Sequence, residues 1–190
     1  RGLLPPQVQA LAPALREGHR QKENPRRRMK RLTADILAAL RAEAAASPRR
    51  RKNFNLHASS DDPIQRLCNA FEPGTYVRPH RHGIDVWELF LVLGGRAAVL
   101  IFDNEGCVTE RTELQANGEI QVAELPPGVW HSLVALAPNT VLFEVKPGPY
   151  RPTGENDFAA WAPPEGATAS AAFVEWMARA AVGERAPVRA

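Results

Sequence analysis

Short apolar runs separated by turn residues dominate the chain between residues 63 and 147. At least seven runs there have strand character, among them IQRLCNAF, VWELFLVL, RAAVLIF, EIQVAEL, SLVAL and TVLFEVK. The clusters GG, DNEG, NG, PPG and APN separate them as turns. Many short strands at spacings of about 8 to 12 residues are typical of an antiparallel sandwich or barrel of the jelly-roll kind. The pattern therefore predicts an all-β core.

Helical patterns flank this core on both sides. Thr33 is a suitable N-cap for an alanine-rich amphipathic helix that ends before Pro48. After a Pro-rich break, a second helix is expected from about residue 168 to about residue 181. We expect Phe173 and Trp176 of this second helix to cover the β core.

Positive charge is concentrated at the start of the chain. Residues 1–52 carry a net charge of +10, residues 53–190 carry −7, and the whole chain carries +3. The runs PRRRMKR and PRRRK lack interleaved aromatic residues. We therefore interpret them as solvated charge, and nucleic acid is not an expected partner.

The shifts in composition divide the chain into four parts. Residue 1 is not Met, whereas Met29 directly precedes the first helix. We therefore expect residues 1–28 to be a basic extension that is disordered or a non-native start. The remaining parts are a helix with a basic linker (29–52), the β-barrel (53–150), and a loop with a helix (151–190).

Composition narrows the class of protein. With 190 residues and 44% hydrophobic residues, the chain can bury one sizeable core, and about one domain is expected. It has no run of 18 apolar residues, so no membrane partner is expected. The first residues lack the layout of a secretory signal, and two cysteines are too few for a disulfide framework. We therefore expect a cytoplasmic protein.

Three histidines and a glutamate form a candidate set of metal donors. His80 and His82 stand two apart, so on a strand their side chains share one face, about 6.6 Å apart along the backbone. Glu88 opens a strand whose inward phase is otherwise apolar, and a buried carboxylate needs a partner. PPGVWH delivers His131 to another strand. Together they offer three imidazoles and one carboxylate to a divalent ion.

These residues resemble the first motif of the cupin family. That motif has a glycine, five residues, H-x-H, a short spacer, a glutamate, six residues and a glycine. Gly74, His80, His82, Glu88 and Gly95 fit it, with a five-residue spacer after His82 that is one residue longer than usual.

The second cupin motif, built around P-x-G-x-x-H, is matched by Pro126, Gly128 and His131. Gly118 stands two residues further from Pro126 than the family's usual glycine, and Ala135 replaces a frequent Asn. The departures leave the ligands intact. The resemblance implies a single cupin fold, a double-stranded β-helix or jelly-roll barrel, with flanking N- and C-terminal helices.

Four further segments resemble the WbuC-type cupin-fold metalloproteins, which turn up in bacterial surface-polysaccharide (O-antigen) gene clusters. They are SPRRRKNFNLH, DDPIQRLCNAFEPGTYVRPHRH, EVKPGPYRP and DFAAWAPPE. The resemblance covers residues 29 to 178 and names a fold and a metal site better than it names a reaction.

Candidates for substrate contact follow from strand phase and from this resemblance. Tyr76 and Arg78 share the inward phase of His80 and His82, although Arg78 can instead pair with Glu72 or Asp85 at the rim. The segments that resemble the WbuC-type proteins add four further candidates: Arg66, Asn69, Lys146 and Tyr150. Asn53, Asn55 and His57 either reach over the barrel mouth or close turns in an ordered loop. Besides Tyr76, Glu144 is the inward candidate for proton transfer.

Several functions are compatible with such a site. One divalent ion (Fe, Mn, Zn, Ni or Co) suits the donor set. The first hypothesis is an enzyme acting on a sugar or sugar nucleotide by isomerase, epimerase or lyase chemistry. The alternatives are a non-catalytic metal-dependent binding or sensing domain and a metal-dependent dioxygenase. The expected partner is a small anionic or sugar-like ligand, with a homodimer as one arrangement of the chain.

Overall fold

A computed structural model describes residues 29–187, so the predicted extension 1–28 lies outside the described part of the chain. The elements in order are α1 (Ala34–Ala46), β1 (Arg51–Asn55), β2 (Ile64–Phe71), β3 (Glu88–Gly94), β4 (Arg96–Phe102), β5 (Val108–Gln115), β6 (Val122–Leu125), β7 (Trp130–Ala135), β8 (Thr140–Pro147), the short 3₁₀ helix η2 (Glu155–Asp157) and α2 (Ala169–Arg179).

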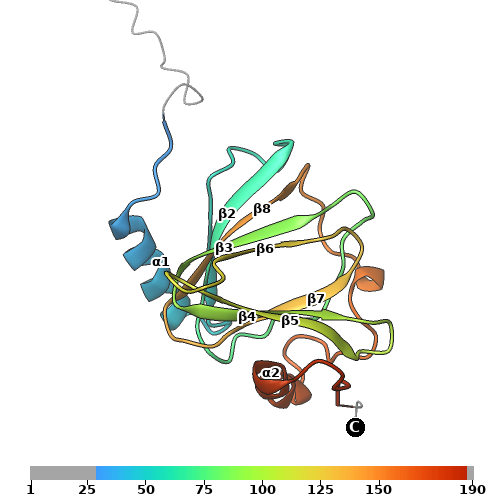
Figure 1. The fold of residues 1–190 in the computed structure, drawn as a ribbon. Helices are drawn as coiled ribbons and strands as arrows, with labels where there is room; N and C mark the ends of the chain where they lie inside the picture. The colour runs from blue at the N-terminus through green and yellow to red at the C-terminus, as the bar shows by residue number, and fades with distance from the viewer. Residues whose placement is uncertain (1–28, 188–190) are drawn as a thin grey trace, which may run out of the picture.

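The strands form two antiparallel sheets that face each other (Figure 1). The first sheet has the order β1-β2-β8-β3-β6, and the second has the order β5-β4-β7. Seven strands lie between residues 63 and 147, as the hydrophobic pattern predicts. The all-β core with flanking helices is confirmed, but over residues 29–187 the strands make two separate sheets rather than one closed barrel.

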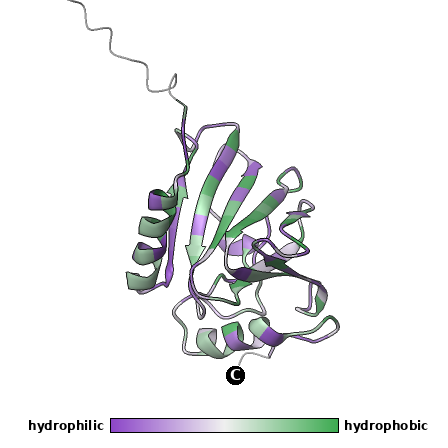
Figure 2. Cartoon of the chain, turned by 60° about the vertical axis from the view of Figure 1, so that its left-hand side comes forward, coloured by the Kyte–Doolittle hydropathy of each residue, from purple (hydrophilic) through white to green (hydrophobic). Residues whose placement is uncertain are grey.

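Alternation along the strands divides the apolar residues among three clusters. On β4, Ala97 and Val99 face the first sheet, whereas Ala98 and Leu100 face outward beneath α2. Side chains from both sheets fill the space between them, among them Phe90, Val92, Leu114, Leu133 and Leu142. This arrangement produces a layered molecule in which a helix covers the outer face of each sheet (Figures 1 and 2).

The helix α1 covers the outer face of the first sheet. The Thr33 hydroxyl accepts a hydrogen bond from the Ile36 amide at 3.3 Å, which satisfies one of the free amides at the helix start. The helix ends at Ser47, before Pro48, as predicted. Leu40 and Ala44 on the buried face of the helix pack against Cys68, Ala70 and Val141 on the outer face of the sheet.

The helix α2 covers the outer face of the second sheet. Phe173, Trp176 and Met177 are buried there, which confirms the predicted covering role of the two aromatic residues. The Phe173 ring packs edge-on against Trp176 with 5.2 Å between ring centroids. None of the helices described in residues 29–187 is long and apolar enough to cross a membrane.

The strand β1 is the main difference from the predicted elements. Residues 51–55 pair antiparallel with β2, although this stretch was predicted as the end of a linker followed by a loop. The sequence RKNFN is mostly polar because β1 is an edge strand whose side chains are largely exposed. Backbone pairing with β2 rather than apolar burial holds it, so the hydrophobic pattern carries no signal for it.

Candidate metal centre

Backbone pairing brings the two histidine segments together. The His80 amide donates to the His131 carbonyl at 3.0 Å, and the His131 amide donates to the His80 carbonyl at 2.8 Å. His131 is the second residue of β7 and follows a turn in which Gly128 has a φ of +75°, a conformation that favours glycine. Glu88 is the first residue of β3, so all four predicted donors meet at one end of the two sheets.

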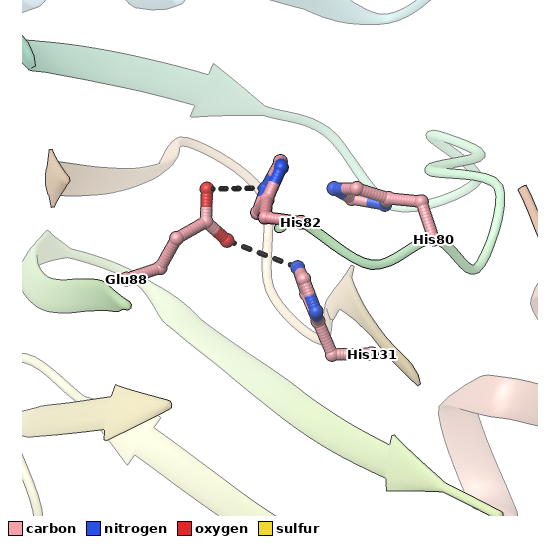
Figure 3. Close-up of side chains that lie close together, drawn as sticks. All are labelled: His80, His82, Glu88 and His131. Carbon is pink, nitrogen blue, oxygen red and sulfur yellow. Dashed lines mark ion pairs between the residues drawn. The ribbon is translucent and has the colours of Figure 1, made fainter. Parts of the chain in front are cut away.

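The donor atoms of these residues converge on one point (Figure 3). One ligand atom from each of His80, His82, Glu88 and His131 lies within 4.8 Å of the others. The two Glu88 oxygens lie 2.9 Å from His82 Nε2 and 2.9 Å from His131 Nε2. The structure therefore brings together the four donors that the sequence predicts, and such a set can hold a metal ion.

Hydrogen bonds fix the orientation of two of the rings. Nδ1 of His80 lies 3.0 Å from the Arg78 carbonyl, and Nδ1 of His131 lies 3.0 Å from the Val129 carbonyl. A carbonyl oxygen only accepts hydrogen bonds, so Nδ1 carries the proton in both rings. In a neutral ring Nε2 is then left with a lone pair, which is the form that binds metals.

The contacts around Glu88 favour a cation at this point. The Nε2 atoms of His82 and His131 are buried and make no aligned hydrogen bond within residues 29–187, although each lies 2.9 Å from a Glu88 oxygen. The lone pair that Nε2 of His131 uses for metal binding points toward a carboxylate oxygen, and two acceptors at this distance repel each other unless a proton or a metal ion lies between them. A metal ion bound by both atoms removes this repulsion, so the residues fit the group.

The charge states also suit a metal ion. Burial and the neighbouring His131 lower the pKa of His80 to about 3, so this ring is neutral at physiological pH. Burial alone raises the pKa of Glu88, but contacts with His131 and His82 and the charge of Lys146 outweigh it and hold the pKa well below its usual range. Glu88 is therefore ionised although it is only 3% exposed.

A buried network extends from Glu88 across the first sheet. Lys146 Nζ lies 2.7 Å from Glu88 Oε1 and 2.7 Å from Glu144 Oε1. Asn69 Nδ2 donates to the other oxygen of Glu144 at 2.7 Å. Burial and Glu88 raise the pKa of Glu144, whereas the two carboxylates raise the pKa of Lys146 against the effect of its burial. Three predicted candidates, Asn69, Glu144 and Lys146, thus lie beside the metal donors.

These residues line a cavity of about 180 Å³ that we call the metal cavity. His80, Glu88 and His131 lie on its wall with the Asn69–Glu144–Lys146 network. Its remaining wall consists of apolar side chains and one arginine: Phe71, Val77, Phe90, Leu133 and Arg51. Sequence reasoning missed Arg51, because it stands within a basic run that was interpreted as solvated linker.

Tyr76 and Arg78 do not face the metal cavity, so the predicted inward phase is wrong. The Tyr76 hydroxyl donates to the Pro163 carbonyl at 2.7 Å. The Arg78 guanidinium donates to the Ala159 carbonyl at 3.3 Å and lies 4.9 Å from the Phe158 ring centroid. Residues 75–79 form no regular strand, so side-chain alternation does not extend back from His80.

The acidic group nearest Arg78 also differs from the prediction. Arg78 Nη1 lies 3.8 Å from a carboxylate oxygen of Glu155, rather than pairing with Glu72 or Asp85. The alternation does hold for one step at Arg81, whose guanidinium lies 4.4 Å from the Trp130 ring centroid while His80 and His82 face the centre.

The other predicted contact residues lie in two different places. The Arg66 side chain is exposed and pairs with Asp62 at 3.1 Å, away from the metal cavity. A second cavity of about 390 Å³ brings together the remaining predicted residues: Asn53, Asn55, His57 and Tyr150. Lys146 lines this cavity as well as the metal cavity, so the two adjoin.

Comparisons with known proteins give one partial family match. Residues 32–114, less than half of the chain, match the family described as Domain of unknown function (DUF6016). None of the curated proteins compared with the chain matches it. The WbuC-type resemblance therefore stays a prediction.

Several solved structures show a distant likeness. The chain is similar to KdgF from Halomonas sp. (22% identity, 53% of this chain, 80% of that chain, TM-score 0.42). It is also similar to an oxalate oxidase in complex with the substrate analogue glycolate (15% identity, 56% of this chain, 55% of that chain, TM-score 0.44). A third is a cupin superfamily protein from Desulfitobacterium hafniense DCB-2 (18% identity, 51% of this chain, 76% of that chain, TM-score 0.40). At such low TM-scores, the function of this chain is inferred from its own residues.

Proposed function

We propose that the protein is a metal-dependent enzyme of the cupin type that binds one divalent ion through His80, His82, Glu88 and His131. Imidazole and carboxylate donors suit Fe, Mn, Zn, Ni and Co alike. When bound, the ion would polarise an oxygen atom of the substrate. The neutral His80 ring, the ionised Glu88 and the two Nε2 atoms without aligned partners support this assignment.

The position of Glu144 carries the proposal that the site is catalytic. A sensor needs only the ligands of the ion, whereas an isomerase, epimerase or lyase also needs a group that accepts or gives a proton. Glu144 lines the metal cavity and is not one of the four donors. Asn69 donates a hydrogen bond to one of its oxygens at 2.7 Å, and Lys146 lies 2.7 Å from the other in an ion pair that lacks hydrogen-bond alignment.

The remaining wall of the metal cavity prepares the site for such a step. Lys146 holds Glu88 and Glu144 at the same time, which keeps a metal ligand and the proton-transfer group in a constant relation. Phe71, Val77 and Phe90 form an apolar side of the cavity.

The substrate class that we propose is a sugar or sugar nucleotide. The adjoining 390 Å³ cavity supplies amide, hydroxyl and imidazole groups of the kind that bind hydroxyl-rich molecules. The WbuC-type resemblance supports a role in bacterial surface-polysaccharide (O-antigen) synthesis, and that link rests on the resemblance alone.

Elemental analysis of protein purified without added metal tests the first half of the proposal. We expect about one divalent ion per chain in the wild type. We expect far less in His82→Ala and in His131→Ala, both of which should still fold. Full metal occupancy in both variants would contradict the assignment of the ligands.

The catalytic half is tested by incubating the metal-loaded protein with a panel of nucleotide sugars and following products by mass spectrometry. Glu144→Gln should retain metal and lose about 10²-fold to 10⁴-fold in turnover, the usual contribution of a positioned acid or base. Glu119→Gln, an exposed residue, is the matched control. Binding of nucleotide sugars without any conversion would instead favour the sensing domain.

A further inference from the structure

The 390 Å³ cavity beside the metal cavity has its own walls, and we call it the β1 cavity. Asn53 and Asn55 of β1 and Leu67 of β2 form one side, and His57, Ser60 and Tyr150 contribute from loops. Its volume lies within the range of about 300 to 1,000 Å³ that is common for small-molecule sites. Lys146 stands between the two cavities.

The loops around the β1 cavity are tied together by the backbone. The Tyr150 amide donates to the Ser60 carbonyl at 2.7 Å, and the Gly148 amide donates to the Pro63 carbonyl at 2.8 Å. The segments approach so closely that a Cβ at Gly148 would lie 2.0 Å from the Asp62 carbonyl oxygen. The cavity is therefore built into the fold.

The polar groups of the β1 cavity retain capacity for hydrogen bonds. In the side chains, Asn53 Nδ2 donates to Asn55 Oδ1 at 3.0 Å. The side-chain oxygen Oδ1 of Asn53 and the side-chain nitrogen Nδ2 of Asn55 remain for a ligand. His57 Nδ1 lies 3.0 Å from the backbone of Arg66, so its Nε2 stays available. Acceptors and donors placed next to each other match sugar hydroxyl groups, which both give and take hydrogen bonds.

The β1 cavity offers no free positive charge to an anion. Among the residues that the structure describes, the lining contains no Asp, Glu or Arg, and its one lysine is Lys146. Lys146 lies 2.7 Å from each of two carboxylates, so its charge is already compensated. By contrast, a third cavity of about 380 Å³ on the His82 side contains Arg81 and Arg151 with Asp85 and Asp157. A phosphate or carboxylate in the β1 cavity would therefore find no uncompensated positive charge among its lining residues.

We propose that the β1 cavity binds an uncharged, hydroxyl-bearing saccharide unit of the substrate. The amides of Asn53 and Asn55 bond to its hydroxyls, and the Tyr150 ring and Leu67 cover its apolar face. Charged parts of the substrate lie outside this cavity. This inference deepens the proposed function and rests on it for the link to the metal centre.

Saturation-transfer NMR on the full, metal-loaded chain tests the proposal with neutral probes. The probes are glucose, galactose, mannose and N-acetylglucosamine, each paired with its phosphate ester. We expect at least one neutral sugar to bind. Asn55→Ala and Tyr150→Ala should each weaken this binding about threefold to tenfold, the range for losing one neutral hydrogen bond or a similar contact. Gln115→Ala, an exposed amide residue on the other sheet, should leave it unchanged.

This experiment can contradict the β1 cavity proposal without contradicting the metal assignment. Metal content is measured on the same samples. If metal is bound but none of the four neutral sugars binds, or binding is unchanged in both cavity variants, the β1 cavity proposal is wrong and the metal centre stands. Phosphate esters that bind through Asn55 and Tyr150, when neutral sugars do not, would also overturn it. Absence of metal would instead refute the proposed function, whereas sugar binding that depends on Asn55 would still support the cavity.

Discussion

The space between the two sheets differs sharply from one end to the other. At one end Val92, Ala97, Val99, Leu114 and Leu142 pack into an apolar cluster. At the other end, strands β2, β3 and β8 carry ionisable and amide side chains: Asn69, Glu88, Glu144 and Lys146. On β8 the change from apolar to ionisable occurs within two residues. Leu142 and Glu144 project from the same face of the strand, and the first is apolar whereas the second is ionisable.

This contrast shows how one pair of sheets separates stability from chemistry. Removal of apolar surface from water at the first end stabilises the fold through close packing and needs no hydrogen-bond partners at fixed positions. At the second end every buried polar group needs a partner at a fixed distance, and the network around Lys146 supplies most of these partners. We therefore expect mutations at the two ends to respond differently to metal.

The largest effect is expected from Lys146→Met. In metal-free protein this change leaves Glu88 and Glu144 without their shared cation, and breaking a buried charge pair costs about 3 to 5 kcal/mol of folding free energy. Bound metal should reduce the loss because a cation again faces Glu88. Urea unfolding with chelator and with saturating metal measures both values.

Lys52→Met is the matched control for this variant. Lys52 lies 2.9 Å from Glu43, and both side chains are about half exposed (49% and 57%). An exposed ion pair of this kind contributes about 0 to 1 kcal/mol. If Lys146→Met costs no more than Lys52→Met, or costs the same with and without metal, the network does not have the role given to it here.

A somewhat smaller and metal-independent effect is expected from Leu142→Ala. The side chain is fully buried in the apolar cluster, and such truncations cost about 2 to 5 kcal/mol. The same loss should appear with chelator and with metal. Val122→Ala, at a side chain that is 47% exposed, should change stability by about 0.5 kcal/mol at most. A loss in Leu142→Ala that metal reverses would mean that the two ends are not separate.

The smallest effect is expected in the labelling of Cys68, which lies on the outer face of β2 directly before the inward-facing Asn69. Cys68 is fully buried under α1, and burial raises the pKa of its thiol to about 11. Only the thiolate reacts, so in Cys107→Ser a thiol reagent at about pH 8 should label the protein only after unfolding. Rapid labelling of the native variant would show that α1 opens or that Cys68 is exposed.

The sequence predicts most of the fold because the core strands are apolar and the turns between them are rich in glycine. β2 coincides with the run IQRLCNAF, and the N-cap Thr33 marks the start of α1. The four metal donors are also predictable, since their residue types and spacing are rare in combination. Asn69 and Lys146 are predictable as site residues because they lie in segments that resemble the WbuC-type proteins.

The predictions that failed concern side chains and strands whose positions depend on contacts with distant parts of the sequence. Tyr76 and Arg78 were assigned by strand alternation, but residues 75–79 are not in a regular strand, and tertiary contacts with the segment at 158–163 direct both side chains away. β1 was missed because its edge position requires backbone pairing and no apolar pattern. The role of Lys146 between two carboxylates depends on Glu88 of β3, which lies far away in the sequence, as well as on Glu144, two residues before it on β8.

Anomalous X-ray diffraction from crystals of the protein purified without added metal tests the central claim most directly. Data on both sides of the absorption edges of Fe, Mn, Zn, Ni and Co identify and place the ion in one experiment. We expect one peak about 2.0 to 2.2 Å from the Nε2 atoms of the three histidines and from a Glu88 oxygen. After a soak in metal solution, a difference map with no peak among His80, His82, Glu88 and His131 would contradict it.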